Sequence, residues 1–223
     1  RLSAIRSFYR WLLREGHAHV NPADGIRAPK SSRKLPNVLD VDEMQALLDH
    51  PGNATPASIR DRAMFELLYS SALRVSELCA LRWPDVDFGQ QLVRVVGKGA
   101  KTRVVPFGSQ AGAALRAWRE LGVSAADAAV FPDRTGAPVS TNTVRERLRK
   151  WAQSAGVWKR VHPHLLRHSC ASHLLESSGN LRAVQEMLGH ADIGTTQIYT
   201  HLDFQHLAKV YDAAHPRARK KPE

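Results

Sequence analysis

Hydrophobic residues recur every three or four positions along most of this 223-residue chain, a pattern typical of helices with one buried face. The first such stretch covers residues 2–13 and carries a row of arginines on its polar face. The segment that follows, residues 20–36, contains prolines, serines and basic residues and reads as a linker. We therefore expect two domains, residues 1–34 and residues 35–223.

Helical spacing continues through the second domain. Asp40 followed by Glu43 has the form of a capping box, which predicts a helix over residues 40–50. Ser76 is expected to cap the next short helix. Arg74 then lies in the turn before it, either as a surface arginine or with its guanidinium facing a ligand at the helix N-terminus. Further helices are expected over residues 58–72, 109–121, 141–156, 164–175, 180–189 and 204–214.

One stretch changes to an alternating pattern. Residues 91–96 and 102–107 alternate apolar and polar side chains on either side of the turn GKGAK, which predicts a β-hairpin. Lys98 and Lys101 lie in that turn, where lysines most simply serve solubility, although flanking glycines leave Lys98 free to reach across a groove. The chain is thus expected to be mainly α with a small antiparallel β-sheet or hairpin, an α+β fold.

Charge narrows the choice of partners. The chain holds 32 Lys and Arg against 21 Asp and Glu, a net charge of +11 that favours a polyanion such as nucleic acid. A membrane partner is set aside because no stretch approaches the roughly 20 apolar residues of a span. Cys79 and Cys170 are far apart in sequence and are interpreted as reduced core thiols of a cytoplasmic protein.

Basic residues gather in places that suit a phosphate backbone. The helix expected over residues 141–156 has the most one-signed face of the chain, and a helix of this kind fits a major groove. Such a face is also common where it is merely solvated. The candidate DNA-binding residues are Arg6, Arg10, Arg33, Lys34, Lys101, Arg145, Arg147, Arg149 and Lys150.

Residues 162–201 gather the candidate chemistry. His164 and Arg167 lie three apart on one helix face, so an imidazole and a guanidinium can meet the same ligand. His190 follows the expected C-cap of the next helix, and Tyr199 lies on a separate short element. Each of these residues taken alone also fits a structural role, as a helix cap or a half-buried phenol.

The histidines of this stretch raise the question of a metal site. The sequence has no HExxH or paired CxxC spacing, and Arg167 lies among the would-be ligands, where its charge repels a cation. We therefore expect no metal and no other cofactor.

The full set of these residues resembles the active-site signature of the tyrosine recombinases, also called the phage integrase family. Its members, in order, are Arg74, Lys98, His164, Arg167, His190 and Tyr199. The resemblance spans residues 35–214 and includes the motifs SALRVSEL, VVGKGAKTRVVP, HPHLLRHSCASHLL and QEMLGHADIGTTQIYTH. The tail HLDFQHLAKVYDAAHPRA looks like that of one of the two partner recombinases that resolve chromosome dimers in bacteria. Ala72 stands where most relatives have glycine.

The resemblance implies a DNA strand transferase that needs neither metal nor ATP. Arg74, Arg167 and His190 would bind the non-bridging phosphate oxygens. Tyr199 would be the nucleophile, with His164 as the candidate base, and Lys98 is implied as the general acid.

The resemblance also implies partners and a domain plan. The partners are a double-stranded recombination site, a second recombinase in a heterotetramer, and a DNA translocase at the division septum. Residues 1–34 would be the last helix and linker of an N-terminal core-binding (SAM-like helical) DNA-clamp domain, so the chain is expected to begin inside a longer protein. Residues 204–214 are expected to pack into a neighbouring protomer through an apolar stripe of Leu207, Val210 and Tyr211.

Three other functions remain open at this point. A mobile-element integrase or a type IB topoisomerase-like enzyme would use the same chemistry. A catalytically silent DNA-binding relative would keep the fold and the grip on DNA but form no covalent intermediate.

Overall fold

A computed structural model describes residues 2–26, 38–97, 102–122, 128–188 and 210–218. The chain divides into two compact units, Arg1–Asn37 and Val38–Glu223. This division falls three residues after the one expected from composition. The two units are described separately below.

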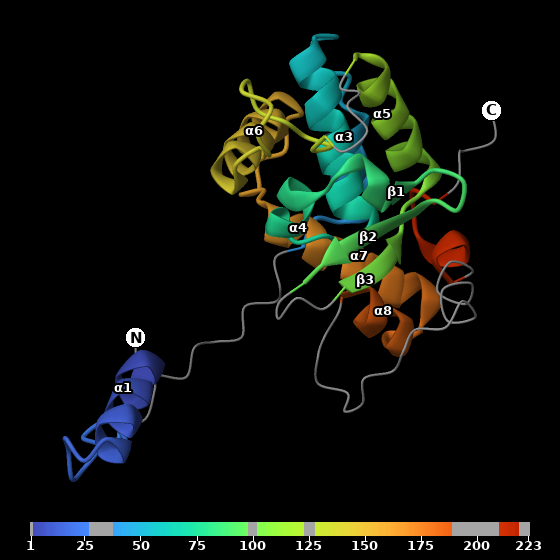
Figure 1. The fold of residues 1–223 in the computed structure, drawn as a ribbon. Helices are drawn as coiled ribbons and strands as arrows, with labels where there is room; N and C mark the ends of the chain where they lie inside the picture. Colours follow the sequence, from blue (N-terminus) through green and yellow to red (C-terminus); the bar gives the residue numbers. More distant parts are fainter. Residues whose placement is uncertain (1, 27–37, 98–101, 123–127, 189–209, 219–223) are drawn as a thin grey trace. The chain divides into compact units, whose positions relative to one another are not determined.

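The first unit contains one helix, α1 (Leu2–Arg14), over the residues expected (Figure 1). Its apolar face is open, since Ile5, Phe8 and Trp11 are each about half exposed. Arg6 folds back on its own unit by donating from Nε to the Ala23 carbonyl at 3.0 Å. The helix is therefore held by this turn-back rather than by a core of its own.

The second unit is mostly helical with one small sheet, which confirms the expected fold class (Figure 1). The Asp40–Glu43 capping box is present, with reciprocal bonds of 2.9 and 2.8 Å between side chains and backbone N–H groups. The helices of this unit are α2 (Val41–Asp49), α3 (Pro56–Ser70), α4 (Val75–Ala80), α5 (Ser109–Glu120), α6 (Thr141–Ser154), α7 (Pro163–Ser178) and α8 (Leu181–Leu188), with a 3-10 turn η1 (Trp83–Asp85).

The sheet is antiparallel with the order β1 (Val86–Asp87), β2 (Leu92–Val96), β3 (Thr102–Pro106). Strands β2 and β3 form the expected hairpin, and the short β1 adds an edge that the sequence pattern did not predict. Alternation places Val105 and Arg103 on the buried side of β3. Lys98 and Lys101 belong to the turn and lie outside the described residues.

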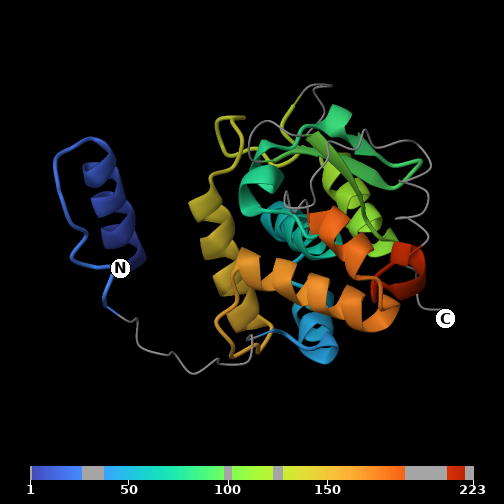
Figure 2. The same ribbon diagram turned by 90° about the horizontal axis from the view of Figure 1, so that it is seen from below.

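Helix α3 is the centre of the core. It contacts α2, α4, α5, α6 and α7, and Figure 1 and Figure 2 show it running through the middle of the unit. Its side chains Phe65, Leu67 and Tyr69 are almost fully buried. Among the described elements, the helices α2, α4, α5, α6 and α7 thus pack around α3. The core therefore fixes the two ends of α3, and with them the positions of the segments that leave it.

The turn from α3 into α4 differs from the expectation. The N-cap of α4 is Arg74 rather than Ser76, which lies exposed inside the helix. The chain reaches Arg74 through Ala72, which has a φ of +48°. A residue with a Cβ is strained in this left-handed region. The left-handed turn starts the helix earlier than the cap preference of serine indicates.

The C-terminal segment, residues 210–218, lies on the second unit (Figure 2). The Tyr211 hydroxyl is 2.5 Å from the Ser70 Oγ, and the Ser109 N–H donates to the Ala218 carbonyl at 2.9 Å. Arg217 pairs with the buried Glu66. Tyr211 therefore belongs to the core of its own chain in this structure, and the expected contact of residues 204–214 with a neighbouring protomer stays a prediction. Leu207 lies outside the described residues.

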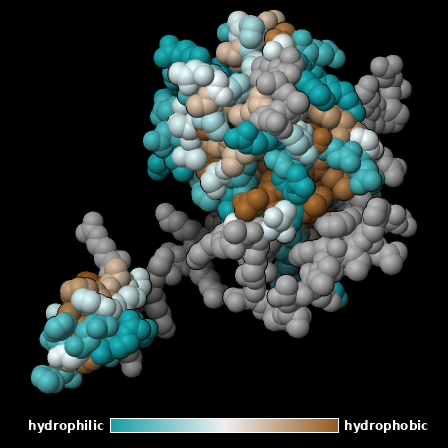
Figure 3. All heavy atoms as spheres, in the orientation of Figure 1, coloured by the Kyte–Doolittle hydropathy of each residue, from teal (hydrophilic) through white to brown (hydrophobic). Residues whose placement is uncertain are grey.

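On the face shown in Figure 3, hydrophobic residues gather near the middle of the second unit, and hydrophilic residues cover most of the rest. Among the described residues, no helix is both long and apolar enough to cross a membrane.

His215 fixes the C-terminal segment as a neutral side chain. Its ring stacks on Tyr211 with centroids 4.5 Å apart, and its Nδ1 accepts from the Arg217 N–H at 3.1 Å. Burial, together with the charges of His173 and Arg217, lowers the pKa of His215 to about 3. The group therefore stabilises the fold fully above its unfolded pKa of about 6.5, and this contribution is lost as pH falls from 6.5 towards 3.

We expect His215→Asn to flatten the pH dependence of stability. The wild type should lose about 2–3 kcal/mol through this group between pH 7 and 4.5, because the unfolded state takes up a proton that the folded state refuses. The variant should be less stable at pH 7 but lose less on acidification, as measured by urea unfolding. His168→Asn, at an exposed position on α7, is the control. An unchanged difference between pH 7 and 4.5 in His215→Asn would contradict the assignment.

Candidate active site

Arg74 is held at the N-terminus of α4 by one carboxylate. Its Nη1 donates to Glu77 Oε1 at 2.8 Å, and its backbone N–H donates to Glu77 Oε2 at 2.8 Å. The Arg74 side chain is 35% exposed, whereas that of Glu77 is 2% exposed. The buried Glu77 carboxylate thus fixes the Arg74 guanidinium on its inner side. The outer edge of the guanidinium reaches solvent, where an anion can approach.

Glu77 has a second arginine partner. Arg103 of β3 places Nη1 2.6 Å from Glu77 Oε1 and Nη2 2.9 Å from Oε2, and its own side chain is 8% exposed. Burial alone would raise the pKa of Glu77, but the hydrogen bonds from Arg103 and Arg74 outweigh burial and lower it. Glu77 is therefore an anion throughout the neutral range.

Helix α7 carries the next two candidates. His162 caps the helix by accepting the Leu165 N–H at 3.1 Å, and Pro163 occupies its first turn. His164 is exposed one turn before Arg167, which is buried. Both residues thus lie on α7, with an accessible imidazole and a buried guanidinium, and their action on one ligand stays a prediction.

Arg167 joins α7 to two other elements. It donates from Nη1 to the Ala72 carbonyl and from Nη2 to the Leu188 carbonyl at 2.6 Å. Burial, followed by the charges of Arg74 and Arg103, lowers the pKa of Arg167 to about 10. The side chain still carries its charge at neutral pH, because this pKa lies well above 7.

The cluster holds more positive than negative charge. Three guanidiniums, those of Arg74, Arg103 and Arg167, surround the single carboxylate of Glu77. The Glu77 carboxylate balances one of the three positive charges, so these four described side chains keep an excess of two positive charges in a partly buried place. Such a site favours a bound anion, and planar guanidiniums match the geometry of a phosphate.

The structure thus brings together Arg74 and Arg167, with His164 one turn away on α7. The other three residues of the predicted set, Lys98, His190 and Tyr199, lie outside the described residues. Glu77 and Arg103 were not singled out from the sequence. Two signals could have found them: an acid three residues after Arg74, and an arginine at an inward-facing position of a predicted strand.

The candidate DNA-binding residues have different surroundings. Arg145, Arg149 and Lys150 are exposed on α6, and Arg10 is exposed on α1. Arg147 is instead committed to Asp61, whose side chain is 3% exposed, at 2.5 Å. Arg6 is tied to carbonyls of its own unit. Three further candidates, Arg33, Lys34 and Lys101, are outside the described ranges.

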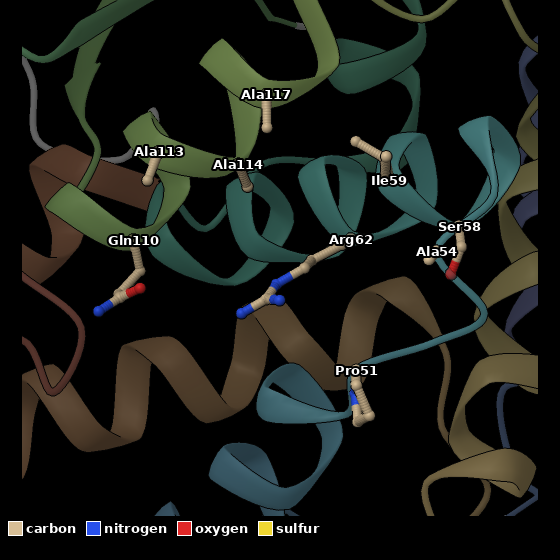
Figure 4. Close-up of a pocket in the computed structure, with 9 residues that line it drawn as sticks. All are labelled: Pro51, Ala54, Ser58, Ile59, Arg62, Gln110, Ala113, Ala114 and Ala117. Atoms are coloured by element: carbon tan, nitrogen blue, oxygen red, sulfur yellow. The ribbon is translucent and has the colours of Figure 1, made fainter.

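The described residues offer no metal cluster, and one cavity lies away from the arginine cluster. Among the described residues, no group of three or more His, Cys, Asp or Glu could hold a metal ion. A cavity of about 300 Å³ lies between α3 and α5, lined by Arg62, Gln110 and Ser58 among alanines (Figure 4). It shares no residue with the arginine cluster.

Comparison with known proteins identifies the family. The model of the phage integrase family matches residues 37–206. The tyrosine recombinase XerC of Xanthomonas axonopodis pv. citri (strain 306) is 61% identical over 221 residues, which cover 99% of this chain and 72% of that protein.

Solved structures agree in fold. The crystal structure of XerA recombinase matches with a TM-score of 0.65 and 30% identity, covering 93% of this chain and 73% of that one. The XerH site-specific recombinase, in a post-cleavage complex with a palindromic difH substrate, matches with a TM-score of 0.65 and 25% identity over 87% of this chain and 59% of that one.

We expect Glu77→Gln to destabilise the second unit by about 3–5 kcal/mol, because it leaves buried guanidiniums without their counter-charge. Denaturant unfolding at pH 7 measures the change. Asp85→Asn is the matched control, since Asp85 pairs with the exposed Arg94 at 3.0 Å and should cost less than about 1 kcal/mol. Equal losses in the two variants would argue against Glu77 as the anchor of the cluster.

Proposed function

The chain belongs to the phage integrase family of tyrosine recombinases, and we propose that it cuts and rejoins DNA at a specific site through Tyr199, as an enzyme of the XerC type. The observation that carries the proposal is the arginine pair, of which Arg74 is fixed by Glu77. Arg167, on the same helix as His164, is fixed by two backbone carbonyls and lies close enough to Arg74 that burial and the charge of Arg74 both lower its pKa. DNA is the substrate of this family, and site-specific strand exchange is its reaction.

The arginine pair suits the transition state of phosphodiester transfer. Negative charge develops on the non-bridging oxygens as the nucleophile attacks, and preorganised cations stabilise that charge without reorganising. Arg74 is anchored by Glu77, and Arg167 by two backbone carbonyls, so neither guanidinium has to be ordered during the reaction. We assign the clamp to these two residues, with His190 as a further donor.

Tyr199 is the proposed nucleophile. A phenol with a pKa of about 10 is ionised in roughly one part per thousand at neutral pH, a handicap of about 4 kcal/mol that a base and nearby cations must offset. We assign His164 as the base that takes the phenolic proton. The Tyr199 oxygen then bonds to phosphorus, the bond to the 5′-oxygen breaks, and that oxygen receives its proton from Lys98.

The product of this step is a 3′-phosphotyrosyl enzyme with a free 5′-hydroxyl on the DNA. The ester keeps the energy of the phosphodiester bond. A 5′-hydroxyl of a second strand can therefore attack it and release Tyr199, which exchanges strands without ATP or water.

The proposal extends to partners and domain plan. We propose a XerD-type recombinase as the second subunit of a heterotetramer that resolves chromosome dimers in the cytoplasm, with a septal DNA translocase as a further partner; the 61% identity to a tyrosine recombinase XerC supports the type of recombinase. We assign residues 1–34 to the end of a DNA-clamp domain, consistent with the open apolar face of α1. Residues 204–214 remain our candidate for contacts between protomers, without Tyr211.

The alternatives make different products. A type IB topoisomerase-like enzyme relaxes supercoiled plasmid without a second site, whereas the proposed recombinase requires its partner for strand exchange. A mobile-element integrase joins unlike sites. A silent relative binds DNA and forms no adduct.

Tyr199→Phe is expected to abolish the covalent protein–DNA adduct on a nicked suicide substrate, because the variant lacks the attacking oxygen. Denaturing gels of labelled substrate measure the adduct, and binding of the same DNA serves as the control for folding. An adduct formed by Tyr199→Phe would sink the mechanism.

Arg167→Ala is expected to slow cleavage by about 10²–10³-fold at saturating DNA, because one clamp on the developing charge is lost. Single-turnover kinetics give the rate, and titration gives the affinity, which should change little. Arg149→Ala, at an exposed position on α6, should show the opposite behaviour, with weaker binding and the same rate once bound. A loss confined to binding would demote Arg167 to a phosphate anchor.

A further inference from the structure

Arg103 lies beneath the arginine clamp without reaching solvent. Its side chain is 8% exposed, and all three guanidinium nitrogens have partners in the protein. Two nitrogens bond Glu77, and Nε donates to the Met187 carbonyl at 3.3 Å. Because Arg103 is buried and binds the carboxylate that holds Arg74, it is placed to support the clamp from within the protein.

These contacts join three elements that are distant in sequence. Arg103 belongs to β3, Glu77 to α4, and Met187 to the last turn of α8. Within the described residues, Glu77 receives both nitrogens of the Arg103 fork, whereas Arg74 gives it one side-chain nitrogen and its backbone N–H. Arg103 therefore supplies two of the four hydrogen bonds that orient the carboxylate, and through it contributes to the orientation of Arg74.

The C-terminal end of α8 depends on the same group. Arg103 donates a hydrogen bond to the Met187 carbonyl, and Arg167 donates one to the Leu188 carbonyl. Cations are favourable at this end of a helix, where the last carbonyls lack partners within the helix. The two guanidiniums thus fix the place from which the chain continues, two residues before His190.

We propose that Arg103 is a positioning residue for strand cleavage, which sets Arg74 through Glu77 and the end of α8 through Met187. This inference rests on the proposed function, since it assigns the support of the same clamp. Lysine cannot replace arginine here: it offers one nitrogen, whereas the contacts require a planar fork and a third N–H.

The test is Arg103→Lys in the full chain, assayed by adduct formation on a nicked suicide substrate. We expect DNA affinity within about twofold of the wild type and a cleavage rate about 10- to 100-fold lower at saturating DNA, the usual effect of removing an outer partner of a reacting group. Arg94→Lys is the matched control and should cleave at the wild-type rate, because Arg94 is an exposed residue of the neighbouring strand β2 that pairs with the half-buried Asp85.

A second substrate separates positioning of the clamp from positioning of the general acid. With sulfur in place of the bridging 5′-oxygen, the leaving group needs no proton, so Lys98→Ala should regain its rate. Arg103→Lys should keep its loss, because the clamp still has to hold the non-bridging oxygens. Recovery of Arg103→Lys on the sulfur substrate would overturn the proposed route through Glu77.

Folding is checked by thermal unfolding of each variant. If Arg103→Lys does not fold, the double variant Glu77→Gln, Arg103→Gln removes one positive and one negative charge together, which keeps the net charge of the cluster, and the Arg74 side chain it leaves without Glu77 is 35% exposed to solvent. We expect this variant to fold, bind DNA and cleave slowly. Cleavage at the wild-type rate in a folded variant would refute the role of Arg103. A wild-type chain that forms no adduct would instead contradict the proposed function.

Discussion

The site depends on one buried anion. Glu77 is the only carboxylate among the described residues that contacts the arginine cluster, and it bonds Arg74 and Arg103 at once. Mutual repulsion would drive these cations apart in a partly buried place if Glu77 were neutral or absent. The single carboxylate therefore has two effects. It allows the guanidiniums to lie close together, and it leaves an excess of positive charge that can bind a phosphate.

The segment that carries the nucleophile is bounded by two anchored points. On one side, Arg167 holds the Leu188 carbonyl at the end of α8. On the other, Tyr211 is buried against Ser70 at the end of α3, the central helix of the core. Both anchors are contacts within the second unit. The arginine cluster provides the one at Leu188, through Arg167. The described chain on either side of residues 189–209, which include the proposed nucleophile Tyr199, is thus held by contacts within the second unit.

Sequence patterns predicted the helices and the hairpin because both depend on local periodicity and capping. They failed where tertiary partners decide. Serine is a common N-cap, yet the N-cap of α4 is Arg74 rather than Ser76. The reason lies in the preceding turn, where Ala72 adopts a left-handed φ of +48° and its carbonyl accepts a hydrogen bond from Arg167. The apolar stripe at Tyr211 was read correctly as buried, but its partner could not be read from the pattern. The grouping of Arg74 with His164 and Arg167 in one site could be predicted only through family resemblance, because no local pattern links Arg74 to the other two.

Basic residues fall into two groups that respond differently to salt. Arg145, Arg149 and Lys150 are exposed, so their attraction to a phosphate backbone is screened within about 10 Å at 0.1 M salt. Arg103 and Arg167 are buried and bonded to fixed protein groups, where mobile ions screen much less. It follows that the net charge of +11 governs how often and how tightly DNA is met, while the bond-breaking step rests on a few buried charges. We therefore expect affinity and cleavage rate to be separable in this chain, because the arginines proposed for each are different ones.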